Sequence, residues 1–534
     1  MTADDTFDVV VVGFGAAGAC AAIEAADAGA RVLVLDRFEG GGASAKSGGS
    51  VYVGGGTETQ AAAGFTDDPD RMFRYLQAET GGAVAAPVLR AFCDESPATF
   101  RWLRDLGLDF GGRFFGHKTT HPPDGHSLYY SGNEPQREGA GAPPRGHVPV
   151  AVGMSGRVLF EALARAARDR RVEVRRHSQA TRLLTEGGRV TGVEVQALRD
   201  LPLLHGLHRL LLDVGTWTRP VGPLIRAFER AGGRSYRVRA RAVVVAAGGF
   251  IFNREMVARH ARPYAGCMPL GTPGDDGASI RLGEGAGAAV TRMEECAAWR
   301  FIYPPEAFVS GVLVNARGER FCDESLYGAT ICRHVAGQPE GRAYLVIDGQ
   351  VARRAREQLA QEVRVLDHPL GKILAGELNA VIFRKYSTLL NLHVNRRAAG
   401  SLDALARSCR LPAGSLERTV AAYNASIAAG QPDAHGKADA YRAPLEEPPF
   451  RAVNCDLANP LFLGPCITLG GLRTDGLTAR VLRADGVPIP GLFAAGRSAA
   501  GICAGGYVSG LSLADCVFSG RRAGRHAAAL SPRA

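Results

Sequence analysis

The sequence predicts an α/β fold built on a parallel sheet, with a second domain inserted into the chain. Three observations carry this prediction. Residues 7–18 form a valine-rich strand that enters a G-x-G-x-x-G turn, and residues 31–36 form a second buried strand. From residue 451 onward the chain returns to the same texture of short strands and glycine-rich turns.

The glycine turn is typical of a dinucleotide-binding βαβ unit. Gly13 allows the tight turn, Gly15 lets the backbone approach a pyrophosphate, and Gly18 lets the helix pack closely on the strand. The helix that begins at Ala16 and Ala17 directs its first amides at the phosphates. With 68 Gly in 534 residues such a spacing arises about once by chance. The flanking strands and helix therefore carry the prediction.

The second strand ends in a carboxylate, Asp36, which is followed by Arg37. Asp36 is placed to hold the hydroxyls of an adenosine ribose, and a carboxylate there disfavours a 2′-phosphate, so FAD or NAD is preferred over NADP. The alternative is an ordinary βαβ unit without a ligand.

A glycine- and serine-rich loop, residues 40–50, follows closely. Its backbone amides and hydroxyls can cradle a phosphate or an isoalloxazine ring, whereas the alternative is a flexible connection. The candidate cofactor residues of this loop are Ser44, Ala45, Lys46, Ser47, Gly48 and Gly49.

Composition places the protein among globular chains, with 46% hydrophobic and 22% charged residues. The 11 cysteines include no C-x-x-C pair, so we expect reduced thiols and no structural metal. We expect a cytoplasmic protein, because no signal peptide precedes the first strand and no apolar run approaches the ~20 residues of a membrane span. The net charge of +10 comes from dispersed arginines, so no nucleic-acid partner is expected.

Four segments divide the middle of the chain. Residues 67–108 look helical, whereas residues 109–150 look irregular. In that irregular segment His147 and the pair Tyr129 and Tyr130 either line a substrate entrance or stabilise a long loop. The strand at 241–250 and the glycine-rich return at 271–289 belong with the first domain. Their candidate cofactor residues are Ala247, Gly248 and Gly277.

An amphipathic insertion spans about 201–234. Its apolar residues fall on one helical face, and they are Leu203, Leu204, Leu207, Leu210, Leu211 and Val214. One interpretation is a flap packed on its own domain or on a second subunit, so an oligomer is compatible with the sequence. The other is a peripheral contact with the inner membrane surface.

Six ordered motifs then form one pattern: residues 13–18 with Asp36, 41–49, 246–250, 274–288, 311–324 and 491–510. Together they resemble the FAD-dependent fumarate reductase and 3-ketosteroid dehydrogenase superfamily over nearly the whole chain. The resemblance implies a Rossmann-like FAD-binding domain built from both chain ends, at 1–290 and 451–534, with a substrate or catalytic domain of α+β type inserted at 291–450. It also implies that Gly496, Arg497, Ser512 and Leu513 contact FAD, which is non-covalent because the 41–49 loop has no histidine.

The branch of the superfamily decides the substrate. Fumarate reductases carry an arginine proton donor after the R-F-x-x-E segment, but here Arg320–Glu324 is followed by Tyr327 without an arginine until Arg333. The segment 505–512 is similar instead to the Tyr-x-Ser signature of the 3-ketosteroid Δ4-(5α)-dehydrogenases. That similarity implies Tyr507, Ser509 and Tyr327 as catalytic residues and a small apolar, steroid-like ketone as substrate.

Desaturation next to a ketone removes a proton from the α carbon and a hydride from the β carbon. In an extended segment Tyr507 and Ser509, at i and i+2, project to one side. We expect Ser509 to be the base, with Tyr507 and Tyr327 relaying the proton or polarising the carbonyl. An external electron acceptor must then reoxidise the enzyme. Alternatives are an ene-reductase acting on an unsaturated acid or ketone, a Δ1-dehydrogenase, and a flavin electron-transfer subunit without its own substrate.

Overall fold

A mostly parallel sheet, to which both halves of the chain contribute, forms the centre of the molecule. The computed structural model describes residues 5–139, 141–217, 221–303, 305–364, 387–462 and 464–530. The central strands run in the order β20-β21-β10-β1-β2-β7, and β9 pairs with β10 and β8. Their bounds are β1 Asp5–Val12, β2 Val32–Leu35, β7 Glu173–Arg175, β8 Ser178–Glu186, β9 Arg189–Leu198, β10 Gly233–Val245, β20 Arg480–Leu482 and β21 Pro488–Ala494.

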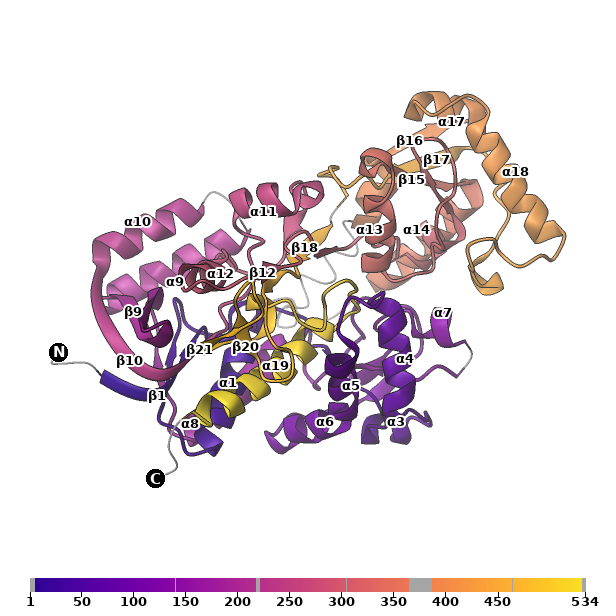
Figure 1. Ribbon diagram of the computed structural model, residues 1–534. Helices are drawn as coiled ribbons and strands as arrows, with labels where there is room; N and C mark the ends of the chain where they lie inside the picture. The colour runs from indigo at the N-terminus through magenta and orange to yellow at the C-terminus, as the bar shows by residue number, and fades with distance from the viewer. Residues whose placement is uncertain are drawn as a thin grey trace.

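The valines of β1 explain why this strand is central. Residues 9–12 are all buried, as expected for a parallel strand that is covered on both faces. On one face lie α1 (Ala16–Asp27), α8 (Gly156–Asp169) and α19 (Leu511–Ala528), and the C-terminal helix α19 runs beside α1 (Figure 1). Residues from near the two ends of the chain therefore build the same layer.

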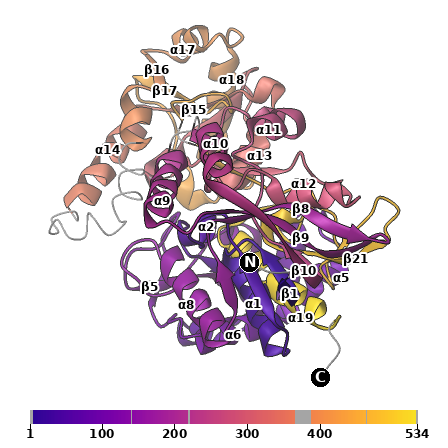
Figure 2. The same ribbon diagram turned by 90° about the vertical axis from the view of Figure 1, so that its left-hand side faces the viewer.

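The insertion is a pair of helices, α9 (Pro202–Trp217) and α10 (Gly222–Gly232), that lies above β8, β9 and β10 (Figure 2). The helical spacing predicted for it is confirmed. Beneath the pair, His208 on α9 shares hydrogen bonds of 3.0 Å with Glu229 on α10 and with His177. These buried polar contacts hold α9 to the rest of the sheet domain.

Residues 51–150 fold into a helical layer with a small sheet of order β3-β6-β5-β4. The prediction of an irregular segment at 109–150 is confirmed for most of its residues, but it missed three short strands and a short helix that fall within the segment. The elements are β3 Val51–Tyr52, α3 Glu58–Ala62, α4 Pro69–Glu79, α5 Ala86–Asp94, α6 Ser96–Asp105, β4 Arg113–Phe115, β5 His126–Tyr129, α7 Glu134–Glu138 and β6 Gly146–His147.

A third unit contains a sheet of order β14-β15-β17-β16 packed with helices. Its elements are β14 Val312–Asn315, α13 Gly328–Ala336, β15 Ala343–Ile347, α14 Gly349–Arg364, β16 Arg396–Ala399, α17 Leu402–Cys409, α18 Ser415–Ala428 and β17 Phe450–Asn454. The strand β17 crosses the expected boundary at residue 450, so we place the end of the inserted domain after Asn454.

Two small sheets, β11-β18-β13 and β12-β19, join the segment before this unit to the segment after it. The strands of these two sheets are β11 Met268–Pro269, β12 Val290–Thr291, β13 Cys296–Ala298, β18 Pro465–Thr468 and β19 Gly471–Leu472. The remaining α-helices are α2 Gly42–Ala45, α11 Arg254–His260 and α12 Ala278–Gly285. Within the described ranges, no helix is both long and apolar enough to cross a bilayer.

Candidate active site

The glycine turn after β1 has the geometry that a pyrophosphate needs. Gly13 has φ of +101°, a conformation that favours glycine. A Cβ on Gly18 would lie 1.9 Å from the Gly13 carbonyl oxygen, so a side chain there would push α1 off the turn. Gly15 is the N-cap of α1 and contributes no capping side chain. The start of α1, at Ala16 and Ala17, therefore fits a phosphate.

The serine-rich loop is ordered against this turn. The Ser44 hydroxyl accepts a hydrogen bond from the Ala16 amide at 3.1 Å, within the short helix α2 that ends at Ala45. The Ser47 hydroxyl donates to the Ser44 carbonyl at 2.7 Å and accepts from the Gly49 amide at 3.1 Å. These bonds make residues 44–49, including Gly48, a structured wall beside the turn.

Asp36 organises the loop that follows β2. Its Oδ2 accepts from the Phe14 amide at 2.7 Å, and its Oδ1 accepts from the amides of Phe38 at 2.8 Å and Gly40 at 3.1 Å. A carboxylate has about four acceptor positions, so capacity remains for a ribose hydroxyl. Asp36 thus links the glycine turn to the second loop.

The cationic side chains of this region are directed to the insertion. Arg37 Nε lies 2.7 Å from Glu229 on α10, and its Nη1 lies 3.0 Å from Asp276. Lys46 Nζ lies 3.3 Å from Asp213 on α9. Because their charges engage carboxylates of neighbouring elements, Arg37 and Lys46 attach the helix pair to the nucleotide loops.

The opposite wall comes from three distant segments. The Ala247 amide donates to the Ser279 hydroxyl at 3.0 Å, close to Gly277, the N-cap of α12. Gly248 and Gly496 have φ of +86° and +58°, in the left-handed region that favours glycine.

Arg497 supplies a hydrogen-bond donor at this wall. Its Nη2 lies 2.8 Å from Asp275, whereas its buried Nη1 has no hydrogen-bond partner among the described residues. An orphaned guanidinium N–H beside glycine-lined backbone can donate to an oxygen of a bound FAD, so the residues present fit this cofactor.

The helix α19 begins next to these walls. Gly510 is its N-cap with φ of +87°, and Ser512 and Leu513 lie in its first turn. Its N-terminal dipole favours negative charge at this end. Burial raises the pKa of Asp515 to about 7, which reduces the opposing charge of that carboxyl near neutral pH.

The three predicted catalytic residues are brought together. The Ser509 hydroxyl accepts a hydrogen bond from Tyr129 at 3.2 Å. The Ser509 side chain also acts on the Tyr327 phenol and lowers its pKa, against a larger rise caused by burial. Trp299 Nε1 donates to the Tyr327 hydroxyl at 2.7 Å, and the Trp299 and Tyr507 rings meet edge to face at 5.3 Å. One tryptophan therefore positions both tyrosines.

Burial controls the acidity of these phenols. It raises the pKa of Tyr507 well above its usual value, and it also raises the pKa of Tyr129. Neutral phenols are hydrogen-bond donors as well as acceptors. The cluster can therefore polarise a carbonyl and pass protons while it carries no charge of its own.

Sequence reasoning gave Tyr129 either an entrance role or a role in stabilising a long loop, and it missed Trp299. The structure places Tyr129 between two serines, since its hydroxyl also lies 2.7 Å from the Ser50 hydroxyl. Tyr130 donates instead to the Ala142 carbonyl at 3.1 Å. The entrance interpretation of His147 was wrong, because this ring is fully buried and burial lowers its pKa to about 4.

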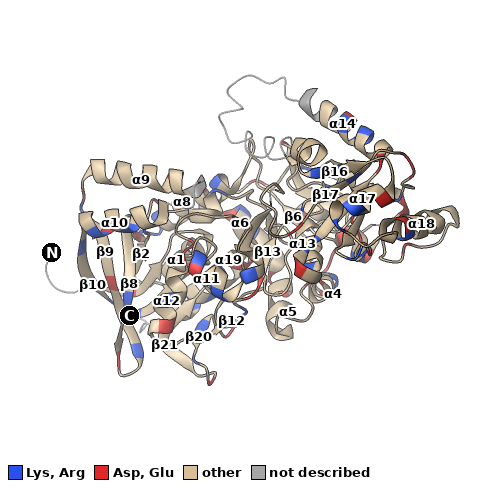
Figure 3. Cartoon of the chain, turned by 90° about the horizontal axis from the view of Figure 1, so that it is seen from above, with Lys and Arg blue, Asp and Glu red and all other residues tan. Residues whose placement is uncertain are grey.

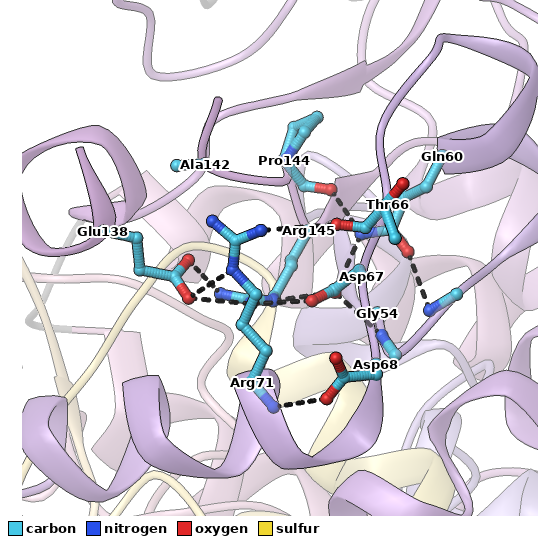
Figure 4. A network of polar contacts seen from close by, with 12 residues as sticks. Gly54, Gln60, Thr66, Asp67, Asp68, Arg71, Glu138, Ala142, Pro144 and Arg145 are labelled. Atoms are coloured by element: carbon cyan, nitrogen blue, oxygen red, sulfur yellow. Dashed lines mark hydrogen bonds and ion pairs between the residues drawn. The ribbon is translucent and has the colours of Figure 1, made fainter. Parts of the chain in front are cut away.

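A buried ion network holds the small sheet that carries Tyr129. Arg145, immediately before β6, lies 2.8 Å from Asp67 and 2.9 Å from Glu138 (Figure 4). Gln60 donates to Asp67 at 3.1 Å and to the Pro144 carbonyl at 2.8 Å. The network therefore fixes β6 in the middle of the sheet, beside β5 and Tyr129.

No group of three or more His, Cys, Asp or Glu side chains is arranged to hold a metal ion within the part of the chain that the structure describes.

Comparisons with known proteins agree with this architecture. The FAD binding domain family matches residues 8–510. The chain is 33% identical over 510 residues to a 3-oxo-5-alpha-steroid 4-dehydrogenase of Comamonas testosteroni, covering 92% of each chain. It is 25% identical over 536 residues to an NADH:fumarate oxidoreductase of Klebsiella pneumoniae (strain 342), covering 98% of this chain and 48% of that protein.

Among solved structures, the chain is similar to a 3-ketosteroid-Δ4-(5α)-dehydrogenase of Rhodococcus jostii RHA1 in complex with 4-androstene-3,17-dione. The TM-score is 0.80 at 33% identity, over 99% of this chain and 98% of the other. Together, the glycine turn, its two walls and these matches show that the chain is an FAD-dependent oxidoreductase and belongs to the superfamily of 3-ketosteroid dehydrogenases and fumarate reductases.

Proposed function

We propose that the protein desaturates a 3-ketosteroid at the carbon pair next to the ketone, in the manner of a Δ4-(5α)-dehydrogenase. The observation that carries this proposal is the position of Ser509 between the hydroxyls of Tyr129 and Tyr327. The steroid enzymes reported above, at 33% identity over nearly the full chain, support the substrate class.

Ser509 acts as the base for the α proton. A serine hydroxyl is a weak base, so it must release its own proton as it accepts one from carbon. Tyr129 is hydrogen-bonded to it and Tyr327 interacts with its side chain, and these two phenols supply that path. Tyr507, held edge to face on Trp299, is placed to donate to the substrate ketone and stabilise the developing enolate.

The bound FAD supplies the hydride acceptor of the family's chemistry. This chain's residues prepare for it by holding the nucleotide between the glycine turn, the 44–49 loop and Arg497. Three aromatic side chains form a row with Phe301 in the middle. The centre of its ring lies 6.2 Å from that of Trp299 and 6.3 Å from that of Tyr327. Such a row fits an apolar polycyclic substrate and gives no cationic clamp for a small dicarboxylate.

Replacing Ser509 by Ala tests the mechanism. The variant should retain FAD but be reduced by a 5α-3-ketosteroid at a rate lower by on the order of 10²- to 10⁴-fold, because proton removal loses its base. The measurement is anaerobic bleaching of the flavin absorbance in a stopped-flow instrument. An unchanged rate would remove Ser509 from the mechanism.

The substrate class is tested with the unchanged protein. Bleaching by saturated 3-ketosteroids supports the desaturase. If no steroid of a panel bleaches the flavin, but the reduced enzyme is reoxidised by an unsaturated acid, the reaction is instead that of an ene-reductase.

We also propose that the α9–α10 pair contacts the inner surface of an anionic membrane. Figure 3 shows the pair at the edge of the molecule. Its exposed apolar residues are Leu203 (84% exposed), Leu207, Leu210, Val214 and Leu224. Exposed Arg209, Arg226 and Arg230 lie on the same helices. An apolar ridge with arginines beside it fits an interface of anionic lipid, where a steroid substrate would also partition.

Flotation with phosphatidylcholine vesicles, with and without phosphatidylglycerol, tests this contact. The protein should float only with the anionic vesicles, and a Leu203→Asp/Leu210→Asp variant should remain at the bottom. Val394→Asp is the matched control, because Val394 is 59% exposed outside the helix pair. Equal flotation of all three proteins, or of none, would contradict a contact through α9.

A further inference from the structure

Near Ser509 lies a group of buried polar atoms to which the mechanism proposed above gives no role. The Ser131 hydroxyl and Oε1 of Glu134 have no hydrogen-bond partner within the described part of the chain. The Tyr52 hydroxyl also lacks a hydrogen bond of normal geometry there, although the Arg145 side chain acts on it both by its charge and as a hydrogen-bond donor. Buried polar groups are nearly always paired with protein or with ordered water, so such a group has a function or holds water.

The sheet register places Tyr52 and Ser131 beside Tyr129, whose hydroxyl bonds to Ser509. Tyr52 on β3 and Tyr129 on β5 both pair with Gly146 on β6, so the three residues form one row on the same face of the sheet. A Cβ on Gly146 would lie 2.5 Å from the Ser131 Cβ and 2.7 Å from the Tyr129 ring. Ser131 therefore fills the space over Gly146, beside Tyr129.

Backbone hydrogen bonds connect Ser131 and Glu134 to the proposed active site. The Ser509 amide donates to the Ser131 carbonyl at 2.9 Å. The next residue, Gly132, donates its amide to Glu134 Oε2 at 2.9 Å, so one oxygen of this carboxyl is held and the other is left open. A Cβ on Gly132 would lie 2.6 Å from Val508, directly before Ser509. Residues 131–134 form one short turn. Ser509 is hydrogen-bonded to its first residue, and Glu134 is its last residue.

Glu134 is fully buried, and the charge of its carboxylate affects the pKa of neighbouring tyrosines. Burial raises its pKa to about 7, against the attraction of Arg145. Its carboxylate in turn helps to raise the pKa of Tyr129 and of Tyr327, after burial as the main cause. The other titratable or charged groups around it are Glu79, Tyr52, Tyr75, Tyr130, Tyr303 and Lys118.

From this juxtaposition we infer that Glu134 is the internal acceptor of the proton that Ser509 removes from the substrate, reached through Tyr129 and through water held by the Ser131 and Tyr52 hydroxyls. The inference rests on the proposed function. Glu134 acts through Tyr129 and does not touch the substrate, so it is a relay residue and not a catalytic one.

The proton balance is complete. The α C–H bond breaks, and its electron pair stays on the substrate as an enolate. The Tyr129 hydroxyl first turns, so that its oxygen accepts from Ser509 and its hydrogen points to water. Ser509 then accepts the substrate proton and gives its own hydroxyl proton to Tyr129, whose hydroxyl proton moves through water to Glu134. The carboxylate of Glu134 ends as a carboxylic acid, while Ser509 and Tyr129 end as they began. The β hydrogen leaves as described under the proposed function.

Glu134→Gln and Glu134→Asp, each as the full FAD-loaded chain, test the relay. Because only the carboxylate accepts a proton, the reduction rate of the unchanged protein should rise with pH through a pKa near 7. The Gln variant should lose this rising limb and be slower by on the order of 10²-fold, whereas the Asp variant should keep the limb. The measurement is anaerobic stopped-flow reduction by a 5α-3-ketosteroid across this pH range. A Gln variant with the original pH profile would overturn the inference.

Ser131→Ala keeps the test decisive if Glu134→Gln does not fold. This change removes a water-holding hydroxyl and should increase the solvent deuterium isotope effect on reduction, with FAD content unchanged. Infrared difference spectra give a second readout, since turnover should produce a carboxylic acid C=O band in the unchanged protein that is weaker in Ser131→Ala. An unaltered isotope effect together with an unaltered band would exclude the relay.

The same experiments separate this inference from the proposed function. If no steroid reduces the unchanged protein, the proposed function fails. If the unchanged protein is reduced but the Glu134 and Ser131 variants behave identically to it, only the relay fails.

Discussion

At the scale of single residues, Arg145 shows how a buried charge supports the site from a distance. Its side chain and that of Asp67 are both fully buried and lie 2.8 Å apart, so removing the arginine leaves a carboxylate without compensation. We expect Arg145→Met to destabilise the protein by about 3–5 kcal/mol and to lower the unfolding midpoint in urea. Arg145→Lys should recover only part of the loss, because lysine does not reproduce the bidentate pairing. The double variant Arg145→Met/Asp67→Leu is the control and should be more stable than Arg145→Met alone, since no buried charge is then unpaired. If the two variants have equal midpoints, the ion pair is not the cause.

At the scale of elements, local patterns were predictable and long-range partners were not. The β1 strand, the turn at Gly13 and the helix pair of the insertion follow from hydrophobic periodicity and glycine spacing, which are properties of short windows. The β3-β6-β5-β4 sheet was missed because its strands are only two to four residues long and do not alternate clearly. Ser509 and Tyr507 were predicted as catalytic residues from a signature of neighbouring residues. Tyr129 bonds to Ser509 across 380 positions of the chain, and no local pattern encodes such a contact. For the same reason Asp36 was predicted as a carboxylate at a strand end, whereas its three amide partners became visible only in the fold.

At the scale of the whole molecule, the contact between α1 and α19 joins the glycine turn to the segment that we propose carries the reaction. A Cβ on Gly520 would lie 2.4 Å from the Ala17 carbonyl oxygen, so the two helices meet backbone to backbone. Ala17 belongs to the first turn of α1 beside the proposed pyrophosphate position, and α19 begins directly after Ser509 and Gly510. We expect Gly520→Ala to cost about 1–3 kcal/mol through overpacking and to weaken FAD binding, because the new Cβ would displace the Ala17 backbone beside the glycine turn. Gly400→Ala is the matched control, because a Cβ there meets no atom within 4 Å. The measurements are the thermal unfolding midpoint and FAD titration of the apoprotein. A Gly520→Ala protein that binds FAD as tightly as Gly400→Ala would show that the two helices transmit no strain, and that the glycine turn is held by the sheet alone.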